Sequence, residues 1–151
     1  MYDTIKWLHV EPSTRCNAWC SSCSRNKSGF GLKDFILEDL DPDRLKQVLD
    51  KLPNLTTVQL CGNLGDPCAS KLIAQQLKII KDRDLDLQIH TNGSLRSTDW
   101  WHTLAKTFGK KITVWFAIDG LEDTHKIYRQ ATNWKKIIEK AKSFIDAGGY
   151  A

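Results

Sequence analysis

The stretch Ile112-Thr-Val-Trp-Phe-Ala-Ile118 is nearly apolar along its whole length. A strand buried on one face alternates apolar and polar residues, whereas a strand covered on both faces reads as a continuous apolar run. Residues 112–118 are therefore typical of a parallel strand with both faces covered. Strands of this kind belong to α/β proteins, in which helices pack on the sheet.

Three further segments have strand patterns, and a helical pattern follows each of the four strands. Leu85, Leu87 and Ile89 alternate with polar residues over 85–90, which is the period of a strand. The other two strand candidates span residues 4–10 and 56–61. The sequence thus predicts four successive strand–helix units.

The expected helices are marked by their ends and by apolar stripes. Asp41 and Pro42 give an N-cap followed by proline at the first helical position. Ser97 or Thr98 caps a later helix, which Gly109 closes. Four stripes are expected to face the core: Leu45, Val48, Leu49 and Leu52; Ile73, Leu77 and Ile80; Trp101, Leu104 and Phe108; Trp134, Ile137, Ile138, Ala141 and Ile145.

Four consecutive βα units predict an α/β fold with a parallel sheet and right-handed crossovers, either open or curled into part of a barrel. The chain has 151 residues, which suits a single domain spanning 1–151. Hydrophobic residues make up 41% of the sequence and charged residues 26%, the balance of an ordinary soluble protein.

Charge and hydropathy argue against nucleic-acid binding and against a membrane protein. Lys and Arg total 22 against 18 acidic residues, and this mild excess of +4 is spread along the chain. No stretch approaches the roughly 20 apolar residues that span a bilayer. The N-terminus has neither the basic start nor the apolar core of a signal peptide. We therefore expect a cytoplasmic protein.

Ligands of parallel α/β folds gather at the carboxyl ends of the strands. The chemically unusual segments of this sequence should therefore follow strands. They do so at residues 11–25, 62–68, 91–94 and 119–129.

The first of these segments contains Cys16, Cys20 and Cys23 in the spacing C-x3-C-x2-C. Three clustered thiols can hold an iron–sulfur cluster or a zinc ion, because soft sulfur ligands favour both. They could also be three buried residues on one face of a helix. A structural zinc site would need a fourth ligand, for which the candidates are Cys61, Cys68, His9 and His90.

The run Leu8-His-Val-Glu-Pro-Ser-Thr-Arg-Cys16-Asn-Ala-Trp-Cys20-Ser-Ser-Cys23-Ser-Arg25 resembles the cluster loop of radical S-adenosylmethionine (radical SAM) enzymes. It looks most like the branch that includes peptide-maturing and molybdopterin-building members. The resemblance implies a partial (βα) barrel with about four βα units present here. It also implies that the three cysteines bind a 4Fe-4S cluster, with S-adenosylmethionine on the fourth iron.

The later segments are similar to further motifs of that family. Gly62-Asn-Leu-Gly65-Asp66-Pro67 resembles the glycine-rich segment whose backbone and acidic residue meet the amino group of S-adenosylmethionine. Thr91-Asn92-Gly93 is similar to a strand-end motif of the family, which implies that Asn92 contributes to the cofactor site. Ala117-Ile-Asp119-Gly120, followed by His125 and Arg129, resembles the motif after the fourth strand.

In that last motif, Arg129 is the expected partner of the cofactor's carboxylate, because a guanidinium binds carboxylates in a bidentate fashion. Asp119 is expected to support Arg129 or to approach substrate. An ordinary surface ion pair is the alternative for each residue.

The sequence also departs from the family's pattern. Asp66 stands where glutamate is usual, Ala117 replaces a serine, and Ser22 replaces a common aromatic residue. Relatives continue with further βα units, so a radical SAM core domain that is incomplete at its C-terminus is expected. The strand at 112–118 would then have an exposed edge that could associate with another chain.

The resemblance implies a reaction in which an external donor, such as a flavodoxin or ferredoxin, reduces the cluster. S-adenosylmethionine is then cleaved to a 5′-deoxyadenosyl radical that abstracts hydrogen from an unknown substrate, a peptide or a small molecule. The alternatives are a zinc-binding structural or interaction domain and a catalytically dead cluster-binding fragment. Cys61 and Cys68 are interpreted as buried or incidental thiols, with ligation of an extra cluster or donation of hydrogen as the alternative. Trp7, Trp115 and Phe116 are interpreted as core residues, with exclusion of water from the barrel interior as the alternative.

Overall fold

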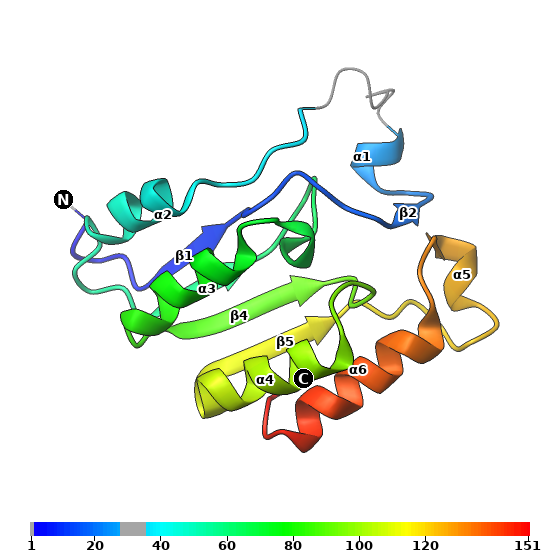
Figure 1. Ribbon diagram of the computed structural model, residues 1–151. Helices are drawn as coiled ribbons and strands as arrows, with labels where there is room; N and C mark the ends of the chain where they lie inside the picture. The colour runs from blue at the N-terminus through cyan, green and yellow to red at the C-terminus, as the bar shows by residue number, and fades with distance from the viewer. Residues whose placement is uncertain (1, 28–35) are drawn as a thin grey trace.

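The computed structural model describes residues 2–27 and 36–151, and its main feature is a parallel sheet of four strands (Figure 1). The strand order is β1-β3-β4-β5. The strands span Trp7–Val10 (β1), Thr57–Leu60 (β3), Asp86–Thr91 (β4) and Ile112–Phe116 (β5). All four predicted strands are therefore confirmed, with small shifts at their ends, and so is the α/β fold class.

Six helices are assigned within the described residues. They are α1 (Ser24–Lys27), α2 (Pro42–Leu49), α3 (Ile73–Asp82), α4 (Thr98–Phe108), α5 (His125–Tyr128) and α6 (Trp134–Asp146). Two 3-10 turns, Pro67–Ala69 and Gly109–Lys111, accompany them. A small antiparallel pair joins β2 (Trp19–Cys20) to β6 (Arg129–Gln130). The sequence predicted the four longer helices but neither the two short ones nor the small strand pair.

Three of the four long helices, α2, α4 and α6, begin where a polar side chain accepts hydrogen bonds from their first backbone N–H groups. The Asp41 carboxylate accepts hydrogen bonds from the backbone N–H groups of Asp43 and Arg44. Ser97 accepts one from Trp100 at the start of α4, so Ser97 is the cap in preference to Thr98. Gly109 ends α4 with a φ of 58°.

One face of the sheet packs on the helices, and the other face carries polar and aromatic side chains. Val58, Leu60, Leu87, Ile89 and Val114 are buried in the same core cluster as the helix stripes. Successive strand residues point to opposite faces, so the other face carries Gln59, His90 and Trp115. The expectation that residues 112–118 are covered on both faces is therefore wrong, since Trp115 is 44% exposed.

Two stripe residues point away from the core. Val48 is 46% exposed and Ile145 is 51% exposed, while Phe144 is fully buried. In α6, Phe144 takes the buried position that was predicted for Ile145. Phe144 lies about two turns after the buried Ile137 and so shares its face, whereas Ile145 is rotated by about 100° from Phe144.

β5 lies at an edge of the sheet, as expected. Part of this edge is paired with the chain's own Tyr150, which forms a parallel bridge with Thr113. The backbone N–H of Val114 donates to the Tyr150 carbonyl at 2.7 Å. Across residues 2–27 and 36–151, no helix has the length and apolar character to cross a membrane.

Candidate functional site

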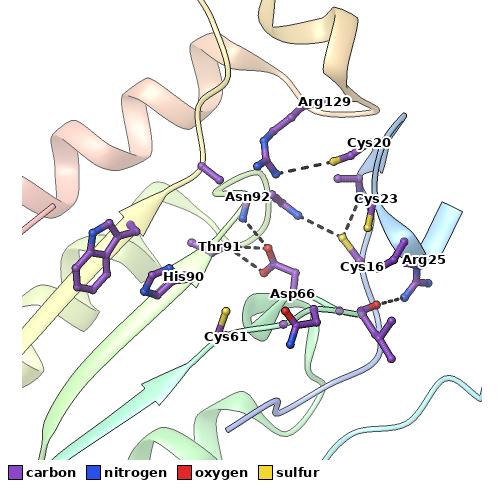
Figure 2. A pocket seen from close by; sticks show the side chains of 18 of the residues that line it. Cys16, Cys20, Cys23, Arg25, Cys61, Asp66, His90, Thr91, Asn92 and Arg129 are labelled. Carbon is purple, nitrogen blue, oxygen red and sulfur yellow. Dashed lines mark hydrogen bonds between the residues drawn. The ribbon is translucent and has the colours of Figure 1, made fainter. Parts of the chain in front are cut away.

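A pocket of about 380 Å³ opens at the carboxyl ends of the strands and brings most of the predicted site residues together (Figure 2). Because parallel strands end at one edge of the sheet, loops far apart in sequence meet there. The pocket is lined by all of the expected site residues except Asp119, namely Cys16, Cys20, Cys23, Gly62, Gly65, Asp66, Asn92 and Arg129. Asp119 reaches the pocket indirectly, through its ion pair with Arg129.

The three clustered cysteines are free thiols on an extended loop. Cys20 is buried, and Cys16 and Cys23 are partly buried. Residues 16–23 form no helix; the segment includes the short strand β2, followed by a turn in which the Cys23 N–H donates to the Cys20 carbonyl at 3.1 Å. The interpretation of these cysteines as one face of a helix is therefore wrong.

Asp39 holds the start of the cysteine loop in place through hydrogen bonds. Its carboxylate accepts a hydrogen bond of 2.6 Å from the Ser13 hydroxyl and one of 3.1 Å from Arg15 Nε. Burial acts to raise the pKa of Asp39, but these hydrogen bonds outweigh it and hold the pKa below its ordinary value of 3.8. The ionised carboxylate thus anchors the loop that carries Cys16.

We expect Asp39→Asn to destabilise the fold by about 1–2 kcal/mol at neutral pH, because it removes two charge-assisted hydrogen bonds. A carboxyl with a lowered folded pKa contributes stability above its unfolded pKa and loses it as the pH falls through the folded pKa. The difference between variant and wild type should therefore begin to shrink as the pH falls below the ordinary pKa of 3.8, and it should be lost once the pH is below the lowered pKa of the folded state. Urea unfolding at several pH values measures it, with the exposed Asp123→Asn as control.

Arg25 connects the cysteine loop to the loop after β3. Its buried guanidinium donates to the Thr14 carbonyl and, at 2.8 Å, to the Leu64 carbonyl. These contacts span 11 and 39 residues of sequence. The arginine follows Cys23 by two positions, but nothing in the local sequence pattern indicates that its side chain turns inward.

The backbone of the glycine-rich segment packs directly against the backbone of the cysteine loop. A Cβ atom on Gly65 would lie 1.9 Å from the Ser13 carbonyl oxygen, closer than any side chain can approach. The next residue, Asp66, donates its backbone N–H to the Arg15 carbonyl at 2.7 Å. Only glycine permits this approach, so the two loops form one wall of the pocket.

Asp66 is buried and joins the loops after β3 and β4. Its carboxylate accepts hydrogen bonds from the backbone N–H of Cys68 at 2.9 Å, the Thr91 hydroxyl at 3.0 Å and the backbone N–H of Asn92 at 2.7 Å. Burial raises the pKa of this carboxyl. The structure therefore gives Asp66 a role in holding the pocket together, while contact with a cofactor amine stays a prediction.

Arg129 is positioned by the small strand pair, which sets it opposite Cys20. Its Nε donates to Asp119, and its Nη1 lies 3.9 Å from the Cys20 sulfur. Burial raises the pKa of the Cys20 thiol, and the nearby Arg129 charge partly offsets this. The expected pairing of Asp119 with Arg129 is thus present. His125 is buried elsewhere, with Nε2 at 2.9 Å from Thr132.

The far wall of the pocket contains a stack of two aromatic rings, a contact that the sequence did not predict. Trp115 stacks on His90 with 4.5 Å between ring centroids, and both line the pocket. The interpretation of Trp7 and Trp115 as core residues is therefore wrong, since both are exposed, whereas Phe116 packs on the core.

Cys61 and Cys68 have different surroundings. Cys61 lines the pocket, whereas Cys68 is buried and burial strongly raises the pKa of its thiol.

Among the residues that the structure describes, no three His, Cys, Asp or Glu side chains gather around one point that could hold a metal ion. A four-iron cluster does not require the cysteines to meet at one point, because each cysteine binds a separate iron.

The surroundings of the cysteine sulfurs fit a cluster in their donor chemistry. The Ala18 backbone N–H and the Asn92 amide donate to Cys16, and Arg129 donates to Cys20. Burial raises the pKa of both thiols, and these donors partly offset it in favour of the thiolate form that metal binding requires.

The chain has the fold of radical SAM enzymes, which confirms the predicted partial barrel. It is similar to SuiB of Streptococcus suis bound to the precursor peptide SuiA, with 19% identity and a TM-score of 0.68. It is also similar to anSMEcpe with bound AdoMet, with 17% identity and a TM-score of 0.70. The match covers 98% of this chain and 32% of SuiB, and 97% of this chain and 41% of anSMEcpe.

A curated relative from Pyrococcus furiosus, the tungsten-containing aldehyde ferredoxin oxidoreductase cofactor-modifying protein, is 27% identical over 130 residues. The match covers 82% of this chain and 33% of that protein. No protein-family model matches the sequence. The chain spans about a third of the length of the curated relative that it matches.

Proposed function

We propose that residues 1–151 are a radical SAM core domain in which Cys16, Cys20 and Cys23 hold a 4Fe-4S cluster. The observation that carries the proposal is the position of these three free thiols in a pocket at the strand ends of a radical SAM fold. When bound and reduced by an external donor, the cluster supplies the electron that cleaves S-adenosylmethionine to a 5′-deoxyadenosyl radical.

The chain's own residues would orient and shield the bound cofactor. Gly62 and Gly65 line the pocket, where their backbone groups would contact the ligand, and Asp66 lines it beside them. Arg129, fixed by Asp119, points into the pocket (Figure 2) and suits the carboxylate of S-adenosylmethionine. Asn92 lines the same wall beside Cys16.

A peptide is the proposed substrate, and a flavodoxin or ferredoxin the proposed electron donor. The support for a peptide is the structural similarity to SuiB, whose structure holds a precursor peptide. The five free thiols suit a reducing, cytoplasmic compartment.

Anaerobic reconstitution with iron and sulfide tests the cluster. We expect a brown protein with about four irons per chain; a colourless protein that takes up one zinc ion would support the structural alternative instead. Addition of dithionite and S-adenosylmethionine should then release 5′-deoxyadenosine. A loaded cluster that releases none would identify a catalytically dead fragment.

A further inference from the structure

The side chain of Asn92 points at Cys16 from the loop after β4 (Figure 2). Its Nδ2 lies 3.6 Å from the Cys16 sulfur and also donates to Asn17 Oδ1 at 3.2 Å. Asn92 is only 4% exposed. A buried amide therefore connects the cysteine loop to a strand end that follows it by 76 residues.

The orientation of this amide is fixed by the groups around it. Its Oδ1 accepts a hydrogen bond of 2.9 Å from the Ser94 backbone N–H and another from the Ser94 hydroxyl. The reverse orientation would set the amide NH2 group against the Ser94 N–H, and two donors facing each other are repulsive. The N–H groups of Asn92 must therefore face the sulfur.

The backbone of Asn92 is fixed as well. Its N–H donates to the buried Asp66 carboxylate at 2.7 Å, and Asn17 Nδ2 donates to the Ser94 hydroxyl at 2.8 Å. Lys140 reaches the same loop and donates to the Ser94 carbonyl. The donor that faces Cys16 thus belongs to a preorganised network that includes Asn17, next to Cys16 in the chain.

A hydrogen bond to a ligand sulfur changes the energetics of a cluster. Reduction adds negative charge, which spreads onto the sulfurs, so an N–H donor stabilises the reduced form more than the oxidised form and raises the potential. Two N–H groups face Cys16, those of Ala18 and Asn92. Of these, only the Asn92 donor belongs to a side chain, so it can be removed without a change to the backbone.

We propose that Asn92 is a positioning residue that orients the Cys16 sulfur and raises the reduction potential of the cluster. This role rests on the proposed function, since it requires a cluster on Cys16, and it is additional to the lining of the cofactor pocket. Asn92 would act through Cys16 and not on the reacting atoms.

The test compares Asn92→Ala with Asn63→Ala after anaerobic reconstitution. Asn63 lines the same pocket but donates to Glu11 at 2.6 Å instead of to a sulfur, so it is a matched control. In a redox titration followed by electron paramagnetic resonance, Asn92→Ala should lower the reduced-to-oxidised ratio at a fixed potential by about tenfold, which is 59 mV for one electron. Asn63→Ala should leave the ratio unchanged.

Asn92→Asp is the second variant, because it keeps the size and the Oδ1 acceptor while replacing the donor with an oxygen. It should shift the potential in the same direction and further. In the apo protein, hydrogen exchange at the Ala18 amide, which donates to Cys16 at 3.4 Å, should accelerate in Asn92→Ala but not in Asn63→Ala.

An unchanged potential in both Asn92 variants, with wild-type cluster content, would overturn the proposal. A wild-type protein that binds no cluster would instead overturn the proposed function, and the exchange measurement would still report whether Asn92 orients the cysteine loop.

Discussion

Alanine at Cys16, Cys20 or Cys23 is expected to abolish the 4Fe-4S cluster. Each of these thiols would bind a separate iron, so the loss of one leaves an iron without a protein ligand. Reconstituted variants should be colourless, contain far less than the expected four or so irons, and release no 5′-deoxyadenosine on reduction with S-adenosylmethionine. Iron and sulfide analysis with visible absorption spectra measures the effect.

Cys61→Ala is the matched control, because Cys61 is a free thiol that lines the same pocket. The cluster hypothesis expects this variant to bind iron normally. A zinc site completed by Cys61 would lose its metal in all four variants. Normal iron content after any substitution in the Cys16–Cys23 loop would contradict the proposed ligand set.

The strands and long helices could be predicted because their signals are local. The alternation of Leu85, Leu87 and Ile89 marks β4, and the Asp41 cap marks the start of α2. Parallel strands end at one edge, so the meeting of four loops also followed from the pattern. These predictions required only neighbouring residues and one topological rule.

The contacts that shape the pocket could not be predicted in this way, because they depend on residues far apart in sequence. The inward turn of Arg25 toward Leu64 and the pairing of Cys20 with Arg129 have no local signature. The apolar character of residues 112–118 led to the wrong prediction that both faces of this strand are covered, because a sequence does not say which face of a sheet the helices leave uncovered. Trp115 consequently faces the pocket instead of the core.

Asp66 shows the same limit at the level of a single side chain. Its place in a motif predicts contact with a cofactor amine, but its carboxylate already accepts hydrogen bonds from Cys68, Thr91 and Asn92. A motif identifies a position in the fold, whereas the hydrogen bonds that a side chain makes depend on the neighbouring loops.

The second large effect is expected at Gly65, where the glycine-rich segment touches the cysteine loop. In Gly65→Ala, the new Cβ would lie 1.9 Å from the Ser13 carbonyl oxygen and 3.0 Å from that of Arg15. Both obstacles are backbone atoms, so the clash is relieved only by moving the loop that carries Cys16. We expect the free energy of unfolding to fall by about 2–3 kcal/mol and cluster assembly to fail with it.

Gly148→Ala separates loop displacement from general destabilisation. Gly148 has a φ of 94° and open space around its Cβ position, so its substitution introduces backbone strain of about 1–2 kcal/mol far from the pocket. Urea unfolding should show both variants destabilised, whereas iron analysis should show a full cluster only in Gly148→Ala. Normal iron content in Gly65→Ala would mean that the cluster site tolerates separation of the two loops, and the close backbone approach would then have no part in holding the cysteines in place.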